Sequence, residues 1–196
     1  MSAPRNSSKM FPMSLPTPID TALVRKHDVR GPRYTSYPTA PQFSSSFDEQ
    51  AYKAAAQRPG AGTDPLSLYV HIPFCRTVCF YCGCNKIVTA NYQRALRYLE
   101  LLDREARLLG ALQGAREVRQ LHFGGGTPTY LRSEELRGLM RSLRTHFNLS
   151  VAPTREFSIE IDPRTVDRTT LETLAGLGFN RMSLGVQDSI PTCSGR

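Results

Sequence analysis

Three absences narrow the range of functions before any motif is considered. No apolar run approaches the roughly 20 residues that span a bilayer, so we expect no membrane protein. The first nineteen residues contain no acid and no apolar secretion core, and their serine and proline content predicts a disordered tail over residues 1–27. The net charge is +8, but the basic residues form no dense cluster, which argues against a nucleic-acid-binding zinc module.

Cysteine is scarce and clustered. Four of the five cysteines fall between Cys75 and Cys84, unlike the even, distributed pattern of a secreted disulfide scaffold. Clustered thiols are typical of a metal site in a reducing compartment. We therefore expect a metal-binding protein of the cytoplasm.

Strand and helix patterns alternate from residue 66 onward. Four segments alternate apolar and polar residues as strands do: 66–72, 118–123, 157–161 and 181–186. Three segments between them have helical spacing of leucines: 92–112, 134–147 and 168–177. Ser133 is the expected N-cap of the second helix, and Gly178 ends the third. Helices of this length between strands imply parallel pairing, so the predicted fold class is α/β.

Each predicted strand has one polar and one apolar face, because side chains alternate along a strand. The polar faces carry Tyr69, His71, Gln120, His122, Ser158, Glu160, Asp162, Ser183 and Gln187. We expect the apolar faces to contact the helices and the polar faces to line a wide barrel lumen that holds a polar ligand. An antiparallel sheet with one solvated face is the alternative, which the regular helices disfavour.

The central motif is the CxxxCxxC loop that follows the first predicted strand. Its three thiolates, from Cys75, Cys79 and Cys82, can bind three irons of a 4Fe-4S cluster and leave the fourth iron open. An open position is typical of a catalytic metal centre. Structural zinc held by Cys82 and Cys84, with Cys75, Cys79 or His71, is the alternative. Zinc sites usually pair two CxxC units, and no second pair exists here.

These motifs resemble the oxygen-independent coproporphyrinogen III oxidases, a family of radical S-adenosylmethionine (SAM) enzymes. The resemblance covers about residues 28–188 and is carried by YVHIPFC, the cysteine loop with GCNK, GPRYTSYPT, FGGGTPTY, SIEIDP and FNRMSLGVQD. In this family SAM binds the open iron through its amino and carboxylate groups. The resemblance implies Cys75, Cys79 and Cys82 as cluster ligands. The SAM contacts that it implies are Tyr69, Tyr81, Gly125, Gly126, Thr127, Glu160 and Gln187.

Three further residues near these motifs have expected roles of their own. Cys84 is a family marker expected near the chemistry without binding iron. His71 fits a structural role in orienting the loop as well as a functional one. Arg33, in the segment that the family folds toward its active site, is a candidate contact for a substrate carboxylate.

The resemblance also implies an activity. A 5′-deoxyadenosyl radical takes hydrogen from the β-carbon of a substrate propionate, and two such decarboxylations convert coproporphyrinogen III to protoporphyrinogen IX. It implies an electron donor such as flavodoxin or ferredoxin, and a monomer. A related radical SAM-like heme chaperone is the alternative, but Cys84 and the RYTSYPT segment favour the oxidase.

The family pattern breaks after Asp188, and family members are more than twice as long. We therefore expect an extended N-terminal segment over 28–65, a partial radical SAM β/α barrel of about four units over 66–188, and an anomalous tail over 189–196. Cys193 lies in that tail and receives no role. A chain of this kind is expected to be an inactive fragment.

Overall fold

The structure, a computed structural model, describes residues 20–28, 39–57, 64–79 and 82–185. The chain divides into two compact units at Ser46 and Phe47. The first contains helix α1 (Thr21–His27) and the 3-10 helix η1 (Ala40–Gln42). The second begins with α2 (Glu49–Ala56) and holds every strand of the structure.

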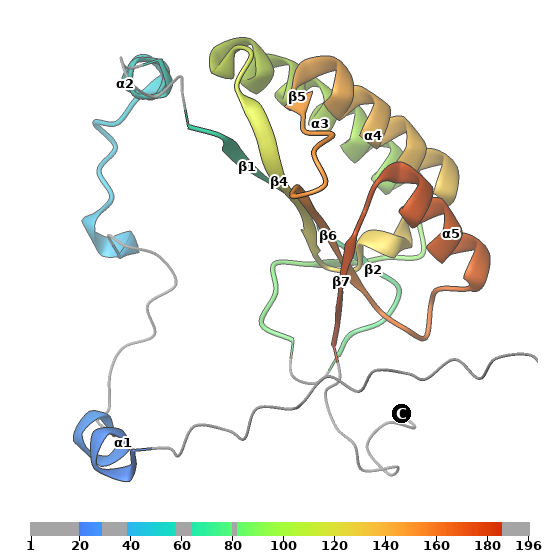
Figure 1. The fold of residues 1–196 in the computed structure, drawn as a ribbon, viewed down its shortest axis with the longest axis horizontal. Helices are drawn as coiled ribbons and strands as arrows, with labels where there is room; N and C mark the ends of the chain where they lie inside the picture. The colour runs from blue at the N-terminus through green and yellow to red at the C-terminus, as the bar shows by residue number, and fades with distance from the viewer. Residues whose placement is uncertain (1–19, 29–38, 58–63, 80–81, 186–196) are drawn as a thin grey trace, which may run out of the picture. The chain divides into compact units, whose positions relative to one another are not determined.

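A parallel sheet forms the centre of the second unit (Figure 1). Its strands are β1 (Leu66–Ile72), β4 (Glu117–Gly125), β6 (Glu156–Ile161) and β7 (Arg181–Leu184). They lie in the order β1-β4-β6-β7, with every neighbouring pair parallel, and the short β5 (Asn148–Leu149) pairs with the start of β4. The predicted α/β class and parallel order are confirmed.

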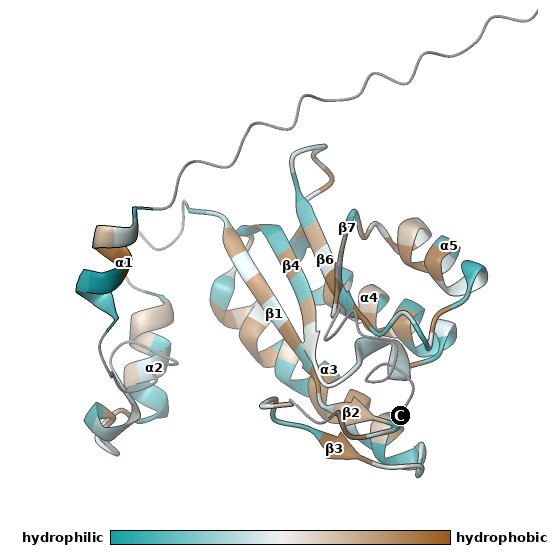
Figure 2. Ribbon diagram, turned by 90° about the horizontal axis from the view of Figure 1, so that it is seen from below, coloured by the Kyte–Doolittle hydropathy of each residue, from teal (hydrophilic) through white to brown (hydrophobic). Residues whose placement is uncertain are grey.

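Three helices connect these strands: α3 (Gln93–Gln113), α4 (Ser133–His146) and α5 (Arg168–Leu177). Figure 2 shows the connecting helices on one face of the sheet. A doubly wound sheet carries helices on both faces, whereas a barrel wall carries them on one. The arrangement is therefore that of part of a β/α barrel. None of the described helices is long and apolar enough to cross a membrane.

The apolar strand faces pack against the helices, as expected. The buried strand residues are Val70, Ile72, Val118, Leu121, Phe123, Phe157, Ile159 and Ile161, and they share one core with Leu136, Leu139, Met140 and Leu143 of α4. Strand β7 differs, because Met182 and Leu184 are 56% and 53% exposed. The prediction for this strand was wrong, since no described element covers its apolar face.

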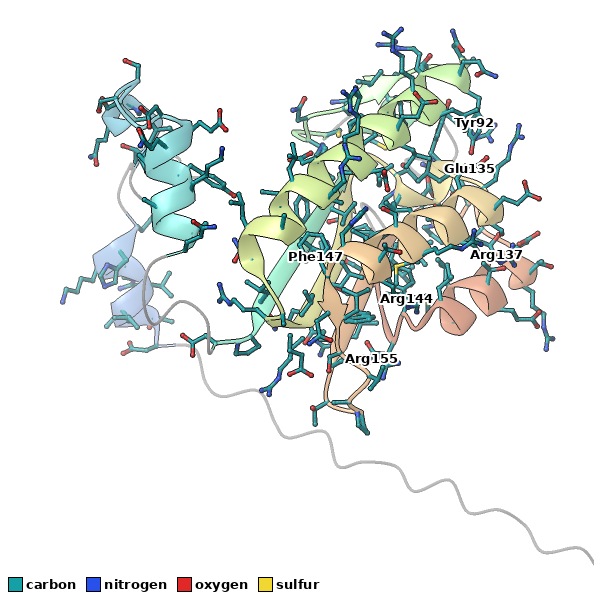
Figure 3. The ribbon with its side chains drawn as sticks, turned by 90° about the horizontal axis from the view of Figure 1, so that it is seen from above. Tyr92, Glu135, Arg137, Arg144, Phe147 and Arg155 are labelled. Atoms are coloured by element: carbon teal, nitrogen blue, oxygen red, sulfur yellow. The ribbon has the colours of Figure 1, made fainter. Side chains whose placement is uncertain are left out.

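Arginines on and after α4 fasten α5 to the core (Figure 3). Arg137 donates to Thr173 Oγ1 at 3.1 Å, and Arg144 donates to the carbonyl of Leu177 at 2.6 Å. Helix α5 itself begins at an Asp167 cap, which accepts from Thr170 N at 2.7 Å. It ends at Gly178, whose φ of 99° is in the left-handed region as the C-cap prediction requires.

Three local predictions need correction. Helix α1 lies in the segment expected to be disordered, and α2 lies in the segment expected to be extended. Each begins at an aspartate whose carboxylate accepts backbone N–H bonds, Asp20 for α1 and Asp48 for α2, and these caps outweigh the flanking proline and glycine signals. Ser133 is the first residue of α4 rather than its N-cap, which is Arg132.

Candidate cluster and cofactor site

The cysteine loop leaves the carboxyl end of β1 and is closed at its base by two short strands. Strands β2 (Phe74–Cys75) and β3 (Ile87–Val88) pair in parallel. Ile87 N donates to the Pro73 carbonyl at 2.7 Å, and Thr89 N donates to the Cys75 carbonyl at 3.1 Å. The loop between them is therefore anchored at both ends, which the sequence patterns did not predict.

The loop presents its thiols in different environments. Cys75 is buried, with its sulfur 3.6 Å from Thr127 Oγ1, whereas Cys79 is exposed and Cys82 is half-buried. Cys82 N donates to the Cys79 carbonyl at 3.2 Å, which draws these two residues into one turn. Within the described ranges, no three cysteine, histidine or acidic side chains converge on a single point. The three ligands therefore stay a prediction.

Cys82 and Cys84 have opposite acid–base environments. The backbone N–H of Cys84 lowers the pKa of the Cys82 thiol, and Lys86 lowers it further. The hydrogen bond with Cys82 raises the pKa of the Cys84 thiol. The two thiols therefore titrate as an interacting pair, in which loss of the first proton hinders loss of the second.

His71 joins β1 to the far arm of the cysteine loop. Its Nε2 lies 3.0 Å from the Asn85 carbonyl and must donate, because a carbonyl only accepts. Its Nδ1 lies 3.0 Å from the Tyr69 hydroxyl, which then donates to it. In the neutral ring these two bonds select the tautomer that carries its proton on Nε2. They favour the structural role of His71 in orienting the loop.

Glu160, near the end of β6, is held by two residues of the neighbouring strand β4. Gly125 N donates to its Oε2 at 3.2 Å, and His122 Nε2 lies 3.4 Å from its Oε1. Tyr69 stacks on the His122 ring, with 5.7 Å between the ring centroids. The pKa of Tyr69 is raised, chiefly by burial and to a smaller extent by the negative charge of Glu160. His122 Nδ1 in turn lies 2.7 Å from Ser158 Oγ. Three predicted SAM contacts therefore meet at one place.

The glycine turn at the end of β4 has no room for side chains. Gly125 has a φ of 115°, and a Cβ there would lie 2.6 Å from His71 Cε1. A Cβ on Gly126 would lie 2.7 Å from the Pro73 carbonyl oxygen. Gly126 N and Thr127 N donate to the carbonyls of Ile72 and Phe74 at 2.8 and 2.9 Å. These backbone hydrogen bonds join the turn to the residues that begin the cysteine loop.

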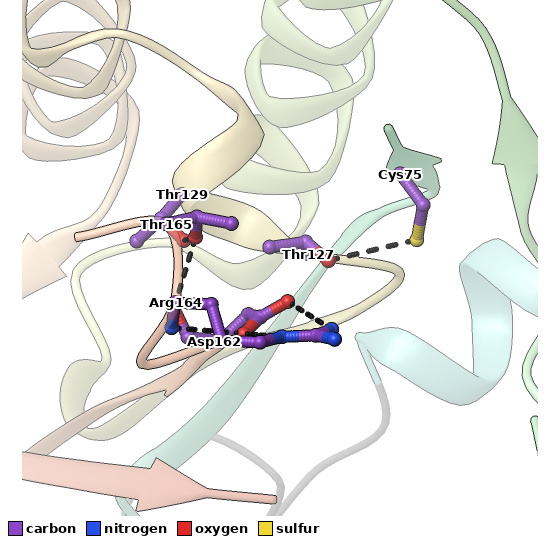
Figure 4. Close-up of polar contacts among 6 residues, drawn as sticks. All are labelled: Cys75, Thr127, Thr129, Asp162, Arg164 and Thr165. Atoms are coloured by element: carbon purple, nitrogen blue, oxygen red, sulfur yellow. Dashed lines mark hydrogen bonds and ion pairs between the residues drawn. The ribbon is translucent and has the colours of Figure 1, made fainter. Parts of the chain in front are cut away.

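A turn after β6 completes the described part of the site (Figure 4). Arg164 donates from Nε and Nη2 to the two carboxylate oxygens of Asp162, at 2.9 and 2.8 Å. Thr165 Oγ1 lies 3.4 Å from Thr129 Oγ1, which connects this turn to the glycine segment. The sequence showed Asp162 on the polar strand face, but nothing in it singled out Arg164.

A cluster of three aromatic side chains, Phe74, Tyr92 and Tyr130, packs against the base of the cysteine loop. Tyr92 stacks on Tyr130 at 5.6 Å, and Tyr130 also contacts Phe74 beside the first cysteine. Tyr92 donates to Glu135 Oε2 at 2.8 Å, and burial raises the pKa of Tyr92 to about 12 (Figure 3). The Tyr130 hydroxyl donates to the Thr89 carbonyl at 3.1 Å, so both ends of the loop rest on this group.

Comparison with known proteins agrees with this geometry. The model of the radical SAM superfamily matches residues 69–191. The oxygen-independent coproporphyrinogen III oxidase of Escherichia coli is 50% identical over 170 residues, covering 86% of this chain and 36% of its own length. That of Mannheimia haemolytica is 46% identical over 145 residues, covering 74% of this chain and 96% of its own length. The chain belongs to the oxygen-independent coproporphyrinogen III oxidase family of the radical SAM superfamily.

A solved member of the family has the same fold. The coproporphyrinogen III oxidase of Escherichia coli, described as a radical SAM enzyme, matches with a TM-score of 0.76 and 47% identity, over 87% of this chain and 37% of that one. The chain therefore spans little more than a third of the length of that relative. Membership of the superfamily implies a 4Fe-4S cluster and SAM as cofactors.

The structure describes some of the family's site residues and not others. Five of the predicted SAM contacts are described and lie at the carboxyl edge of the sheet: Tyr69, Gly125, Gly126, Thr127 and Glu160. The other predicted contacts, Tyr81, Gln187 and Arg33, lie outside the described ranges, as does Cys193, which has no predicted role. A pocket of the second unit lies at the opposite edge, near Pro65 and Gly114, and contains none of the predicted site residues.

Proposed function

We propose that the chain forms the cluster-binding and SAM-binding part of an enzyme that converts coproporphyrinogen III to protoporphyrinogen IX without oxygen. The meeting of the cysteine loop, the glycine turn and Glu160 at one edge of the sheet carries this proposal. In parallel α/β proteins, ligands bind at this edge. Because the chain spans 36% of its Escherichia coli relative, the activity, substrate and partners of the whole enzyme are inferred from the family.

Cys75, Cys79 and Cys82 would hold three irons of the cluster. They lie on one loop whose base is closed by β2 and β3, and the environment of Cys82 favours its thiolate. Cys84 is exposed beside them, and its raised pKa favours the neutral thiol. The donor set therefore suits a cluster with three protein ligands.

Glu160 would bind the amino group or hydroxyls of SAM. Its side chain is 43% exposed, and its two present bonds are long, at 3.2 and 3.4 Å, which leaves acceptor capacity for a ligand. Tyr69 is exposed beside it and would line the same space. Gly125, Gly126 and Thr127 would approach SAM through their backbone. Tyr81 and Gln187 complete the proposed set.

When bound, the two cofactors supply a 5′-deoxyadenosyl radical that takes hydrogen from the β-carbon of a propionate, after which carbon dioxide and one electron leave and a vinyl group remains. The chain's own part is to hold the cofactors and to help exclude water and competing hydrogen donors from them. Its charge of +8 favours a substrate with four carboxylates. Arg33 is one proposed carboxylate contact.

The remaining partners follow from the same proposal. We propose a reducing electron donor such as flavodoxin or ferredoxin, a monomeric state, and a cytoplasmic location. Nucleic acid and membranes are not proposed as partners, because the basic residues are dispersed along the sequence. The heme chaperone is a weaker candidate, since the relatives at 46–50% identity are named as oxidases.

Anaerobic iron–sulfur reconstitution of the 196-residue chain, with iron, zinc and sulfide analysis, tests the proposal. Cys79→Ala and Cys84→Ala form a matched pair, because both remove an exposed thiol from the same loop. We expect loss of the cluster from Cys79→Ala and its retention in Cys84→Ala. A wild-type chain that bound zinc and no iron would contradict the proposal.

A further inference from the structure

The polar face of the sheet carries two rows of residues across β1, β4 and β6, which lie side by side in Figure 2. In the first row, Tyr69 is the direct partner of His122, and His122 is the direct partner of Ser158. Gly124 and Glu160 come two residues later on β4 and β6, so they belong to the second row. Glu160 nevertheless reaches back to the first row, where His122 Nε2 lies 3.4 Å from its Oε1. His122 therefore joins the two rows.

Gly124 leaves the space in which these side chains meet. A Cβ at this position would lie 3.0 Å from His122 Nε2, 3.1 Å from Glu160 Oε1 and 3.1 Å from Tyr69 Cε2. All three distances are shorter than ordinary van der Waals contact, so an added side chain would require at least one of these groups to move. Gly124 does not have a positive φ. The packing of its neighbours, rather than the backbone conformation, therefore explains the glycine here.

The hydrogen bonds of His122 set the direction of its ring. Its Nδ1 lies 2.7 Å from Ser158 Oγ, and its Nε2 faces the Glu160 carboxylate, which only accepts when it is ionised. In the neutral ring the proton is then on Nε2, and Ser158 donates to Nδ1. Ser158 Oγ also lies 3.4 Å from the Leu121 carbonyl, a longer contact that competes less well for the one hydroxyl proton. His122 thus donates toward Glu160 from a ring that Ser158 holds on its other side.

We propose that His122, supported by Ser158, is a positioning residue that orients the Glu160 carboxylate toward SAM. His122 Nε2 and Gly125 N contact different oxygens of that carboxylate, at 3.4 and 3.2 Å, and both donors belong to β4. Two donors on one strand set the plane of the carboxylate and leave its other lone pairs for the amino group or hydroxyls of the ligand. The inference rests on the proposed function, because it requires SAM. It goes beyond that function, since His122 and Ser158 are not among the predicted cluster ligands or SAM contacts.

Two amide substitutions separate the two nitrogens of His122. Glutamine places its amide nitrogen near the position of Nε2, whereas asparagine, one methylene shorter, places its amide near the position of Nδ1. His122→Gln therefore keeps a donor for Glu160, and His122→Asn keeps only a partner for Ser158. Affinity for SAM is measured by anaerobic equilibrium dialysis of the reconstituted 196-residue chain, with the iron content of each variant determined alongside.

We expect His122→Asn to raise the dissociation constant of SAM about tenfold, at the lower end for a bond to a charged group because this bond is long. His122→Gln should recover most of that loss. Gln120→Ala is the matched control, because Gln120 lies on the same face of β4 and bonds to Ser67 at 2.5 Å. Its affinity for SAM should equal that of the wild type.

The outcomes separate positioning from a merely structural role. Equal affinities of the His122→Asn and His122→Gln chains would overturn the inference, as would loss of iron from both. An equal loss of affinity in Gln120→Ala would overturn it too. A wild-type chain that takes up no iron, or that binds no SAM once it holds iron, overturns the proposed function itself, which is a different result.

Discussion

Replacing Gly125 by alanine tests how the glycine turn and the cysteine loop are joined. The new Cβ would lie 2.6–3.0 Å from three atoms of the His71 ring, and the residue would keep a φ of 115°. Backbone strain of this kind costs about 1–3 kcal/mol, and overpacking costs a further 1–3 kcal/mol. We therefore expect Gly125→Ala to lower the free energy of unfolding by about 2–6 kcal/mol.

Urea unfolding followed by circular dichroism measures this loss, and Gly138 provides the control. Gly138 lies in α4 with no atom within 4 Å of an added Cβ. The same substitution there should stabilise the chain by about 0.5–1 kcal/mol, because alanine favours the helix. The two changes add the same methyl group and are expected to have opposite signs.

A double-mutant cycle separates the two causes at Gly125. In a His71→Ala background the steric contact is absent, so Gly125→Ala should cost about 1–3 kcal/mol less than in the wild type. The backbone strain persists in both backgrounds. An equal cost in the two backgrounds would refute the packing of the glycine turn against His71.

Two further predictions concern the supports of the site. Burial raises the pKa of Tyr92 from 10.0 to about 12, so its neutral hydroxyl stabilises the fold below pH 10. This contribution is lost as the pH rises from 10 to 12. Tyr92→Phe should remove that loss in urea unfolding curves measured across this pH range. Asp167→Ala removes the carboxylate that caps α5 through Thr170 N, and urea unfolding should show a loss of about 1 kcal/mol, with an unchanged midpoint contradicting the cap.

The regular parts of the fold were predictable because local patterns determine them. The apolar alternation in residues 118–123 and 157–161 marks a buried face, and both segments became central strands. Gly178 was predictable as a helix end because glycine alone readily adopts the positive φ that this position requires. Asp20 and Asp48 carried the corresponding start signals for α1 and α2, but the prolines nearby outweighed them in the prediction.

The contacts that the sequence did not predict are those between turns. The β2–β3 pair has two residues in each strand, too few for a period to be recognised. The ion pair of Asp162 and Arg164 and the stack of Tyr92 on Tyr130 depend on where separate loops meet in space. Motif resemblance located the cysteines and Glu160, but it could not show which neighbours hold them in place.

The glycines of the family's motif have a packing role in this structure beside the SAM-binding role predicted for them. Gly125 and Gly126 were predicted to let SAM approach the backbone, yet their missing side chains are also required by His71 and by Pro73. His71 itself holds Asn85 on the far arm of the cysteine loop. Displacing any one of these groups therefore moves both the proposed cluster site and the proposed SAM site. The two proposed cofactor sites are therefore expected to respond to substitution as one unit, so that an activity loss in a glycine variant would report on that unit before any single SAM contact.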